Sequence, residues 1–169
     1  MRHIISVLVE NRFGVLARVA GLFSGRGYNI ESLSVGVTNN PEHSTMTIVT
    51  SGEEKIIEQI VKQLRKLINV IKVRDITATS HIEREMLLIR VKANSKNRPD
   101  LFSIVNTFRA KIVSLNSESA IIEITGVQEK NIAFLNVLEH YGIVELVRTG
   151  SVAIARDTKN NGDHQNKGV

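Results

Sequence analysis

The chain has 169 residues, of which 42% are hydrophobic, so it can form one domain of ordinary size or two small ones. It contains no cysteine, which excludes disulfides, thiolate metal sites and cysteine nucleophiles. Its first apolar run, Ile4 to Val9, is too short for a membrane span or a secretory signal. The net charge of +5 comes from basic and acidic residues that alternate along the chain, which is typical of solvated surfaces.

The first half of the sequence alternates between strand-like and helix-like patterns. Arg2 to Val9 is an apolar, β-branched run that predicts a buried strand, and apolar residues at helical spacing follow Asn11. Gly25 and Gly27 are typical of the end of a helix. The expected elements are a strand, a helix, two strands, a helix and a strand, at residues 2–9, 16–23, 33–37, 45–50, 56–68 and 70–73.

The same order returns after the polar segment from Thr77 to His81. Arg98-Pro99-Asp100 predicts a helix start, because proline is favoured in the first helical turn. The expected elements lie at residues 86–91, 98–108, 112–115, 120–124, 132–141 and 143–147. On the last helix, the residues expected to face the core are Ile132, Leu135, Leu138 and Tyr141.

Each half therefore predicts a βαββαβ unit, in which two helices back one layer of antiparallel sheet. We expect an α+β protein of tandem ferredoxin-like domains at residues 1–76 and 83–156, joined by a linker at 77–82. The polar segment 157–169 cannot bury enough apolar surface to fold, so we expect it to be disordered. An uncovered sheet face and free strand edges are a liability in water, and we therefore expect dimerisation.

No recognisable spacing of side chains predicts a catalytic or metal centre. The five histidines do not pair at metal-ligand spacing. Gly25 and Gly27 lack the third glycine of a dinucleotide-binding loop, and no nucleophile-elbow or phosphate-loop pattern occurs. We expect no catalytic residue, no metal ligand and no cofactor in this chain.

The segment from Glu10 to Arg18 carries the clearest pattern for ligand binding. It places a strand end, a polar side chain, a glycine and a helix N-terminus within nine positions. Free N–H groups at a helix start attract a carboxylate, Gly14 permits close approach, and Asn11 can both donate and accept hydrogen bonds. These features suit an amino-acid zwitterion. They equally suit a structural role, in which Asn11 caps the helix and Gly14 relieves a tight turn.

This segment and its continuation to Leu33 resemble the ACT domain of acetolactate synthase small subunits. The most specific match is Gly-Leu-Phe-x-x-Arg-Gly-Tyr-Asn-Ile-x-Ser-Leu, which begins at Gly21. Later segments resemble the second domain of that family, namely Glu83-Arg84-Glu85-Met86, Ile124-Thr125-Gly126, Ala133-Phe134-Leu135, Gly142-Ile143-Val144-Glu145 and Arg148-Thr149-Gly150. The resemblance covers residues 1–156.

The resemblance implies a regulatory subunit of acetolactate synthase, also called acetohydroxyacid synthase, in valine, leucine and isoleucine biosynthesis. In that family a large catalytic subunit carries thiamine diphosphate, a magnesium ion and FAD, and condenses two pyruvates or pyruvate with 2-oxobutyrate. The small subunit activates it and confers feedback inhibition by valine, in some members also by leucine or isoleucine. The expected partners are a second copy of this chain bound through the ACT domains, the large subunit and valine. The expected location is the cytoplasm, without nucleic acid or membrane.

The resemblance also implies the effector site, which in this family lies where two ACT domains meet. The matching residues are Asn11, Gly14, Val15, Leu16, Asn29, Ile30, Ser34 and Val35. The two asparagines would hold the amino and carboxylate groups, and the apolar residues would receive a branched side chain. Ser34 replaces a threonine that is commoner in the family, so a hydroxyl is kept and a methyl contact is lost. Gln59 matches a position linked to signalling towards the large subunit, and it also fits a plain solvated helix residue.

Two other functions fit parts of the pattern. The βαββαβ plan also serves RNA recognition, but such modules stack bases on aromatic residues of the central strands. The predicted strands 2–9 and 45–50 contain no aromatic residue. A stand-alone amino-acid sensor, or the regulatory part of a dehydrogenase or an aspartate kinase, would share the first half but not the motifs of the second.

Overall fold

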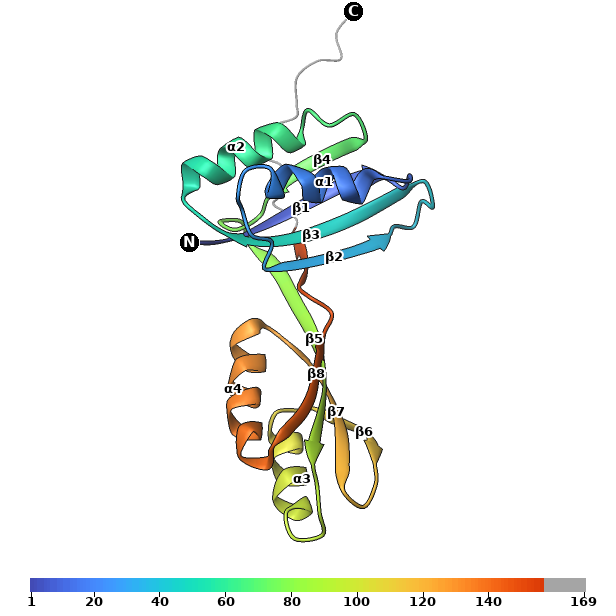
Figure 1. Ribbon diagram of the computed structural model, residues 1–169, viewed down its shortest axis with the longest axis vertical. Helices are drawn as coiled ribbons and strands as arrows, with labels where there is room; N and C mark the ends of the chain where they lie inside the picture. Colours follow the sequence, from blue (N-terminus) through green and yellow to red (C-terminus); the bar gives the residue numbers. More distant parts are fainter. Residues whose placement is uncertain (157–169) are drawn as a thin grey trace, which may run out of the picture.

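The computed structural model describes residues 1–156 and places two α+β units one above the other along the long axis (Figure 1). The first unit contains a four-stranded antiparallel sheet in the order β2-β3-β1-β4, which we call the first sheet. Its strands are β1 (Arg2–Glu10), β2 (Ser32–Val37), β3 (His43–Ser51) and β4 (Val70–Asp75). Helices α1 (Val15–Ser24) and α2 (Glu54–Leu64) cover one face, and we call the other face the open face.

The second unit repeats this plan with its own antiparallel sheet, in the order β6-β7-β5-β8. Its strands are β5 (His81–Lys92), β6 (Lys111–Leu115), β7 (Ser119–Gly126) and β8 (Ile143–Arg148). Its helices are α3 (Arg98–Thr107) and α4 (Gln128–Leu138), with a 3-10 turn at Glu139–Tyr141. The predicted tandem ferredoxin-like fold is confirmed. The predicted disordered segment 157–169 lies outside the described residues.

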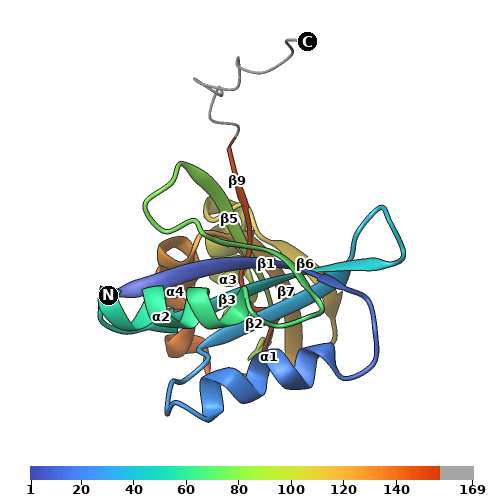
Figure 2. The ribbon, with the colours of Figure 1, turned by 90° about the horizontal axis from the view of Figure 1, so that it is seen from above.

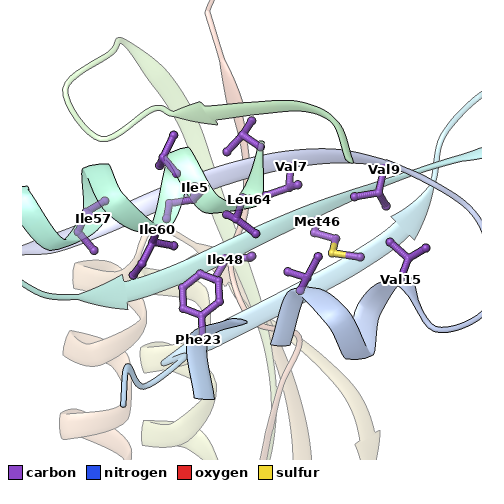
Figure 3. Close-up of a cluster of buried hydrophobic side chains, with 13 residues drawn as sticks. Ile5, Val7, Val9, Val15, Phe23, Met46, Ile48, Ile57, Ile60 and Leu64 are labelled. Atoms are coloured by element: carbon purple, nitrogen blue, oxygen red, sulfur yellow. The ribbon is translucent and has the colours of Figure 1, made fainter. Parts of the chain in front are cut away.

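The core of the first unit lies between the first sheet and its two helices (Figure 3). Alternate residues of β1 point towards the helices, as a strand period of two requires. Phe23 of α1 and Leu64 of α2 are fully buried against them. The sheet residues that complete this part of the core are Ile5, Val7, Val9, Met46 and Ile48.

Two helices differ from the sequence prediction in the residues that they bury. α2 ends at Leu64, so Ile68 lies in the turn to β4 and is 94% exposed instead of continuing the apolar stripe. On α4, Ile132 is 43% exposed, whereas Asn131 and Phe134 are fully buried. The buried face of α4 is therefore rotated relative to the predicted one, and Asn131 can be buried there because its side-chain amide donates to the backbone carbonyl of Glu85 at 3.1 Å and to its carboxylate at 3.4 Å.

The junction between the units also differs from the prediction. β5 begins at His81, inside the segment expected as a linker, and a ninth strand, β9 (Val152–Ala155), was not predicted. β9 pairs antiparallel with residues 81–84 of β5, and we call this two-stranded element the junction ribbon. Seen from above, β9 crosses the strands of the first sheet (Figure 2). The chain therefore covers part of the open face that was expected to need a partner.

Two substitutions on α4 test which face is buried. We expect Leu138→Ala to lower the free energy of unfolding by about 2–5 kcal/mol, because the side chain is fully buried and its loss leaves a cavity. Ile132→Ala should cost less than about 1 kcal/mol, because much of that side chain already meets water. Urea unfolding followed by circular dichroism measures both. A larger loss for Ile132→Ala would contradict the observed orientation.

Candidate functional site

The loop between β1 and α1 is held in place by hydrogen bonds to neighbouring turns. The backbone N–H of Asn11 donates to the carbonyl of Glu42 at 2.7 Å, and its side-chain amide donates to the carbonyl of Pro41 at 2.9 Å. Asn69 anchors the other side by donating to the Glu10 carboxylate at 2.7 Å. Asn11 thus fastens the loop to the turn between β2 and β3. Within residues 1–156 the side-chain amide oxygen of Asn11 makes no hydrogen bond, so it is available to accept one from a ligand.

The start of α1 has no side-chain cap. Gly14 occupies the N-cap position with φ +82°, a left-handed conformation that favours glycine, and no acidic residue lies in the first turn. The N–H of Val15 donates to the Arg12 carbonyl at 3.4 Å, and the next two N–H groups, those of Leu16 and Ala17, have no partner within residues 1–156 and are open to an anion. Leu16 is 44% exposed beside this end, but Val15 is buried in the core and can contribute only through its backbone.

The other predicted residues belong to β2 and the segment before it. Asn29 is exposed, and its carbonyl accepts a hydrogen bond from Thr50 at 2.7 Å, while Ile30 packs against the edge of the core. Ser34 and Val35 lie on β2, which is an edge strand of the first sheet. Gln59 is exposed on α2, on the helical layer.

A single chain does not bring all these residues together. β1 and β2 are parallel, because each pairs antiparallel with β3 between them. Asn11 follows the end of β1, whereas Asn29 precedes the start of β2, next to Thr50, which pairs with His3. The nine residues of β1 therefore separate the two asparagines by roughly 25 Å. One small amino acid cannot contact both within one copy of the chain.

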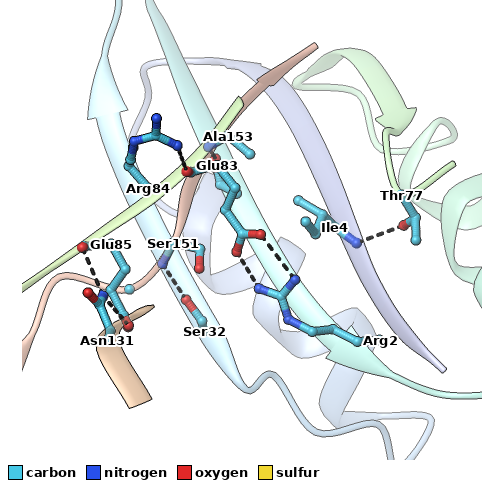
Figure 4. A network of polar contacts seen from close by, with 12 residues as sticks. Arg2, Ile4, Ser32, Thr77, Glu83, Arg84, Glu85, Asn131, Ser151 and Ala153 are labelled. Carbon is cyan, nitrogen blue, oxygen red and sulfur yellow. Dashed lines mark hydrogen bonds and ion pairs between the residues drawn. The ribbon is translucent and has the colours of Figure 1, made fainter. Parts of the chain in front are cut away.

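The junction ribbon is attached to the first sheet by polar contacts that the sequence did not reveal (Figure 4). Arg2 of β1 forms a two-pronged ion pair with Glu83 of β5, one of whose N–O distances is 3.2 Å. The backbone N–H of Ser151 donates to the Ser32 hydroxyl at 2.8 Å. Burial by itself raises the pKa of Glu83, but hydrogen bonds from Arg2 and Ser151 and the charges of Arg2 and His81 outweigh it. The pKa of Glu83 therefore lies below its ordinary value of 4.5.

Gly150 allows the chain to approach β2 at this point. Its φ is +77°, and a Cβ built on it would lie 2.7 Å from the Ser32 hydroxyl oxygen and 3.3 Å from the Leu33 carbonyl. Any larger residue would push the turn between β8 and β9 away from β2. The second unit is thus in direct contact with the strand that carries Ser34 and Val35.

Two grooves flank the junction ribbon on the open face. One, which we call the junction groove, has a volume of about 400 Å³ and includes Ser34 and Val35 in its lining. The other, of about 310 Å³, is lined on the far side of the ribbon by Ser6, Leu8, Lys72 and Arg74 among others. Sequence reasoning missed both grooves, because their walls come from segments far apart in the chain.

Other kinds of site find no support in the described residues. Within residues 1–156, no three histidine, aspartate or glutamate side chains are grouped to hold a metal ion, and no helix is long and apolar enough to cross a membrane. The five phenylalanines lie on helices or in connecting segments, so the sheets present no such ring for stacking a nucleic-acid base.

Comparison with known families accounts for most of the chain. Residues 5–72 match the family described as "AHAS small subunit-like ACT domain", and residues 84–157 match "Small subunit of acetolactate synthase". The two matches follow each other in the same order as the two units of the structure.

Individual relatives agree with these families. The chain is 54% identical to a probable acetolactate synthase small subunit of Archaeoglobus fulgidus, over 94% of this chain and 99% of that protein. It is 51% identical to the acetolactate synthase small subunit of Mycolicibacterium smegmatis, over 91% of each chain. The crystal structure of an acetolactate synthase small subunit from Thermotoga maritima superposes with a TM-score of 0.85 at 42% identity, and covers 94% of this chain and 99% of that one.

The Arg2–Glu83 pair gives a pH-dependent test of the junction. We expect Glu83→Gln to lower the free energy of unfolding by about 1–3 kcal/mol at neutral pH, because it leaves the half-buried guanidinium of Arg2 unpaired. A carboxylate with a depressed pKa stabilises the fold above its unfolded-state pKa and loses that contribution as the pH falls through the folded-state pKa. The difference from the wild type should therefore shrink below about pH 4.5.

Urea unfolding at a series of pH values measures this difference. Glu145→Gln is the control, because it breaks the more exposed pair with Arg90 and should cost less than about 0.5 kcal/mol. A loss for Glu83→Gln that stays constant down to the acid limit would show that the carboxylate is not stabilised by this pair.

Proposed function

Because this chain belongs to the acetolactate synthase small-subunit family, a family of non-catalytic regulatory subunits, we propose that it activates the large catalytic subunit and makes it sensitive to valine. The large subunit would carry thiamine diphosphate, magnesium and FAD, and the complex would work in the cytoplasm. Residues 1–76 would bind the effector, and residues 83–156, with Gln59 of α2, would communicate with the large subunit. Leucine and isoleucine are the alternative effectors.

The direction of the strands supports an effector site built by two copies. β1 and β2 run parallel, so the end of β1 and the end of β2 lie at the same side of the first sheet. If two copies paired through their β2 edges about a two-fold axis, the two β2 strands would run antiparallel. Asn29 of the partner subunit would then lie near Asn11 and Gly14. A pair of chains would thereby bring together the residues that one chain separates.

Exposed apolar side chains near that edge support the same arrangement. Val35 is 44% exposed and Val37 is 59% exposed on the unpaired edge of β2, and Phe13 is fully exposed in the loop before α1. Large apolar side chains concentrated along a free strand edge indicate a surface that another chain covers. The open start of α1 would supply N–H groups to the effector carboxylate, and this feature is the main support for the site.

A matched pair of variants tests the site at Gly14. Both Gly14→Asn and Gly14→Asp place a side chain of the same size at φ +82°, where asparagine and aspartate are among the better-tolerated residues, so they share any backbone strain. Only aspartate adds a negative charge beside the bound carboxylate. We expect that charge to weaken valine binding by about 1–3 kcal/mol, or roughly ten- to a hundredfold, relative to Gly14→Asn.

The readout is acetolactate production by the holoenzyme assembled with each variant, with valine titrated. Both variants should still stimulate the large subunit, and calorimetry on the isolated small subunit reports valine, leucine and isoleucine binding directly. Equal sensitivity of the two variants to valine would place the effector carboxylate elsewhere. Loss of stimulation in a folded Gly14→Asp variant would contradict the separation of sensing from activation.

The proposed pairing of β2 edges has its own test. We expect the wild-type chain to behave as a dimer in light scattering at micromolar concentration, and Val37→Asp to raise the dimer dissociation constant about tenfold or more, because two like charges would face each other across the axis. Val144→Asp is the control, since Val144 is 57% exposed on the edge strand of the other sheet. A monomeric wild type, with and without valine, would refute the proposal.

A further inference from the structure

We propose that the junction groove is a second small-molecule site, separate from the open start of α1, which takes a small monocarboxylate with a branched aliphatic tail and no ammonium group. The groove has a volume of about 400 Å³, within the range of small-ligand pockets. Its walls come from both units, because β2 and β3 supply one side and the junction ribbon supplies the other. The groove shares Ser34 and Val35 with the proposed effector set, whereas Asn11, Gly14 and Asn29 do not line it.

The apolar part of the groove comes from one face of the junction ribbon. Ile82 of β5 pairs with Ile154 of β9, and the next residues on that face are Arg84 and its partner Val152. The three aliphatic side chains are 38–69% exposed, and they line the groove together with Val35 and Val37 of β2. Five branched side chains around one hollow suit a short branched hydrocarbon group.

The charge of the groove selects an anion. Arg84 is the only charged residue in its lining. The guanidinium donates to the neighbouring carbonyl of Glu83, and within residues 1–156 it forms no ion pair with a carboxylate (Figure 4). Its remaining N–H donors are therefore available, and a fork of such donors matches a carboxylate.

The same lining argues against a zwitterion. An amino acid would bring an ammonium group, but no aspartate or glutamate lines the groove to receive it. The lining also includes the hydroxyls of Ser34 and Thr45, which can donate to a carbonyl oxygen, whereas the Thr38 hydroxyl already donates to the Asn40 carbonyl. A 2-oxo acid can accept hydrogen bonds from these hydroxyls through its carbonyl oxygen, which a simple fatty acid lacks. Both acids belong to the same class of ligand.

Three probes with one carbon skeleton distinguish these chemistries. They are 3-methyl-2-oxobutanoate, 3-methylbutanoate and valine, and each is titrated into the full chain to about 10 mM, a range that detects millimolar affinity. Methyl NMR signals of Ile82, Val152 and Ile154 report the groove. We expect both acids to shift these signals, the 2-oxo acid at lower concentration. Valine should leave them in place, even if it binds at the two-copy site.

Substitutions then identify the anion contact. Arg84→Gln should weaken the two acids about tenfold or more, because a charged donor is replaced by a neutral one. Arg84→Lys should restore part of the affinity. The control is Arg74→Gln, an exposed cation of the groove on the other side of the ribbon, which should change the affinity less than about twofold.

Each alternative result overturns the proposal in a defined way. Methyl signals that do not shift at the highest concentration would show that the groove does not bind these acids. Equal loss of affinity in Arg84→Gln and Arg74→Gln would show that the acids are attracted by the positive charge of the surface in general and not by Arg84. Valine shifting the same signals as strongly as the acids would refute the selection against ammonium. The proposed function fails by a separate observation, namely absence of valine binding by calorimetry to the wild-type chain.

Discussion

The ion pair between Arg2 and Glu83 joins the beginning of the first strand to the beginning of the second unit. Within residues 1–156 it is the one ion pair that joins the two units. Both side chains are only partly exposed, so each charge needs the other to offset the water that it loses. β9 pairs beside Glu83 on the open face. The N–H of Ser151, just before β9, donates to the Ser32 hydroxyl, and the N–H of Ala153 in β9 donates to the Thr47 hydroxyl. This ion pair, the hydrogen bonds at 2.8 and 3.4 Å, and the burial of apolar residues such as Ile4 and Val49 together fix the position of both grooves.

The regular elements of both units could be predicted from sequence, because their hydrophobic periods are local. The junction could not. Ile82-Glu83-Arg84-Glu85 contains three consecutive charged residues and resembles a surface segment, and the four residues of β9 are too few to show a hydrophobic period. Their strand conformation is stabilised by pairing across about seventy residues of sequence. The buried Asn131 escaped prediction for a related reason, since its partner Glu85 lies on a distant strand.

The candidate site was predictable only in its local part. The open start of α1 follows from one short segment, whereas the left-handed conformation of Gly14 is a finding of the structure. Asn11 and Asn29 would meet only between two chains, and no local sequence pattern carries that information. Val15 matches the family motif, yet its side chain belongs to the core, because a helix that packs on a sheet must bury one residue of its first turn.

The covering of the open face has a consequence for how the chain can be divided. Ile4 of β1 and Val49 of β3 are paired neighbours on that face, and both are almost fully buried, at 3% and 2% exposure. β9, from the far end of the described chain, is among the elements that contact β1 there. Excising the first unit between the two sheets would therefore expose to water apolar surface that is buried in the intact chain. The boundary between the units is an internal packing surface. A fragment that contains only the first unit would expose this apolar surface to water and would tend to associate with other molecules through it.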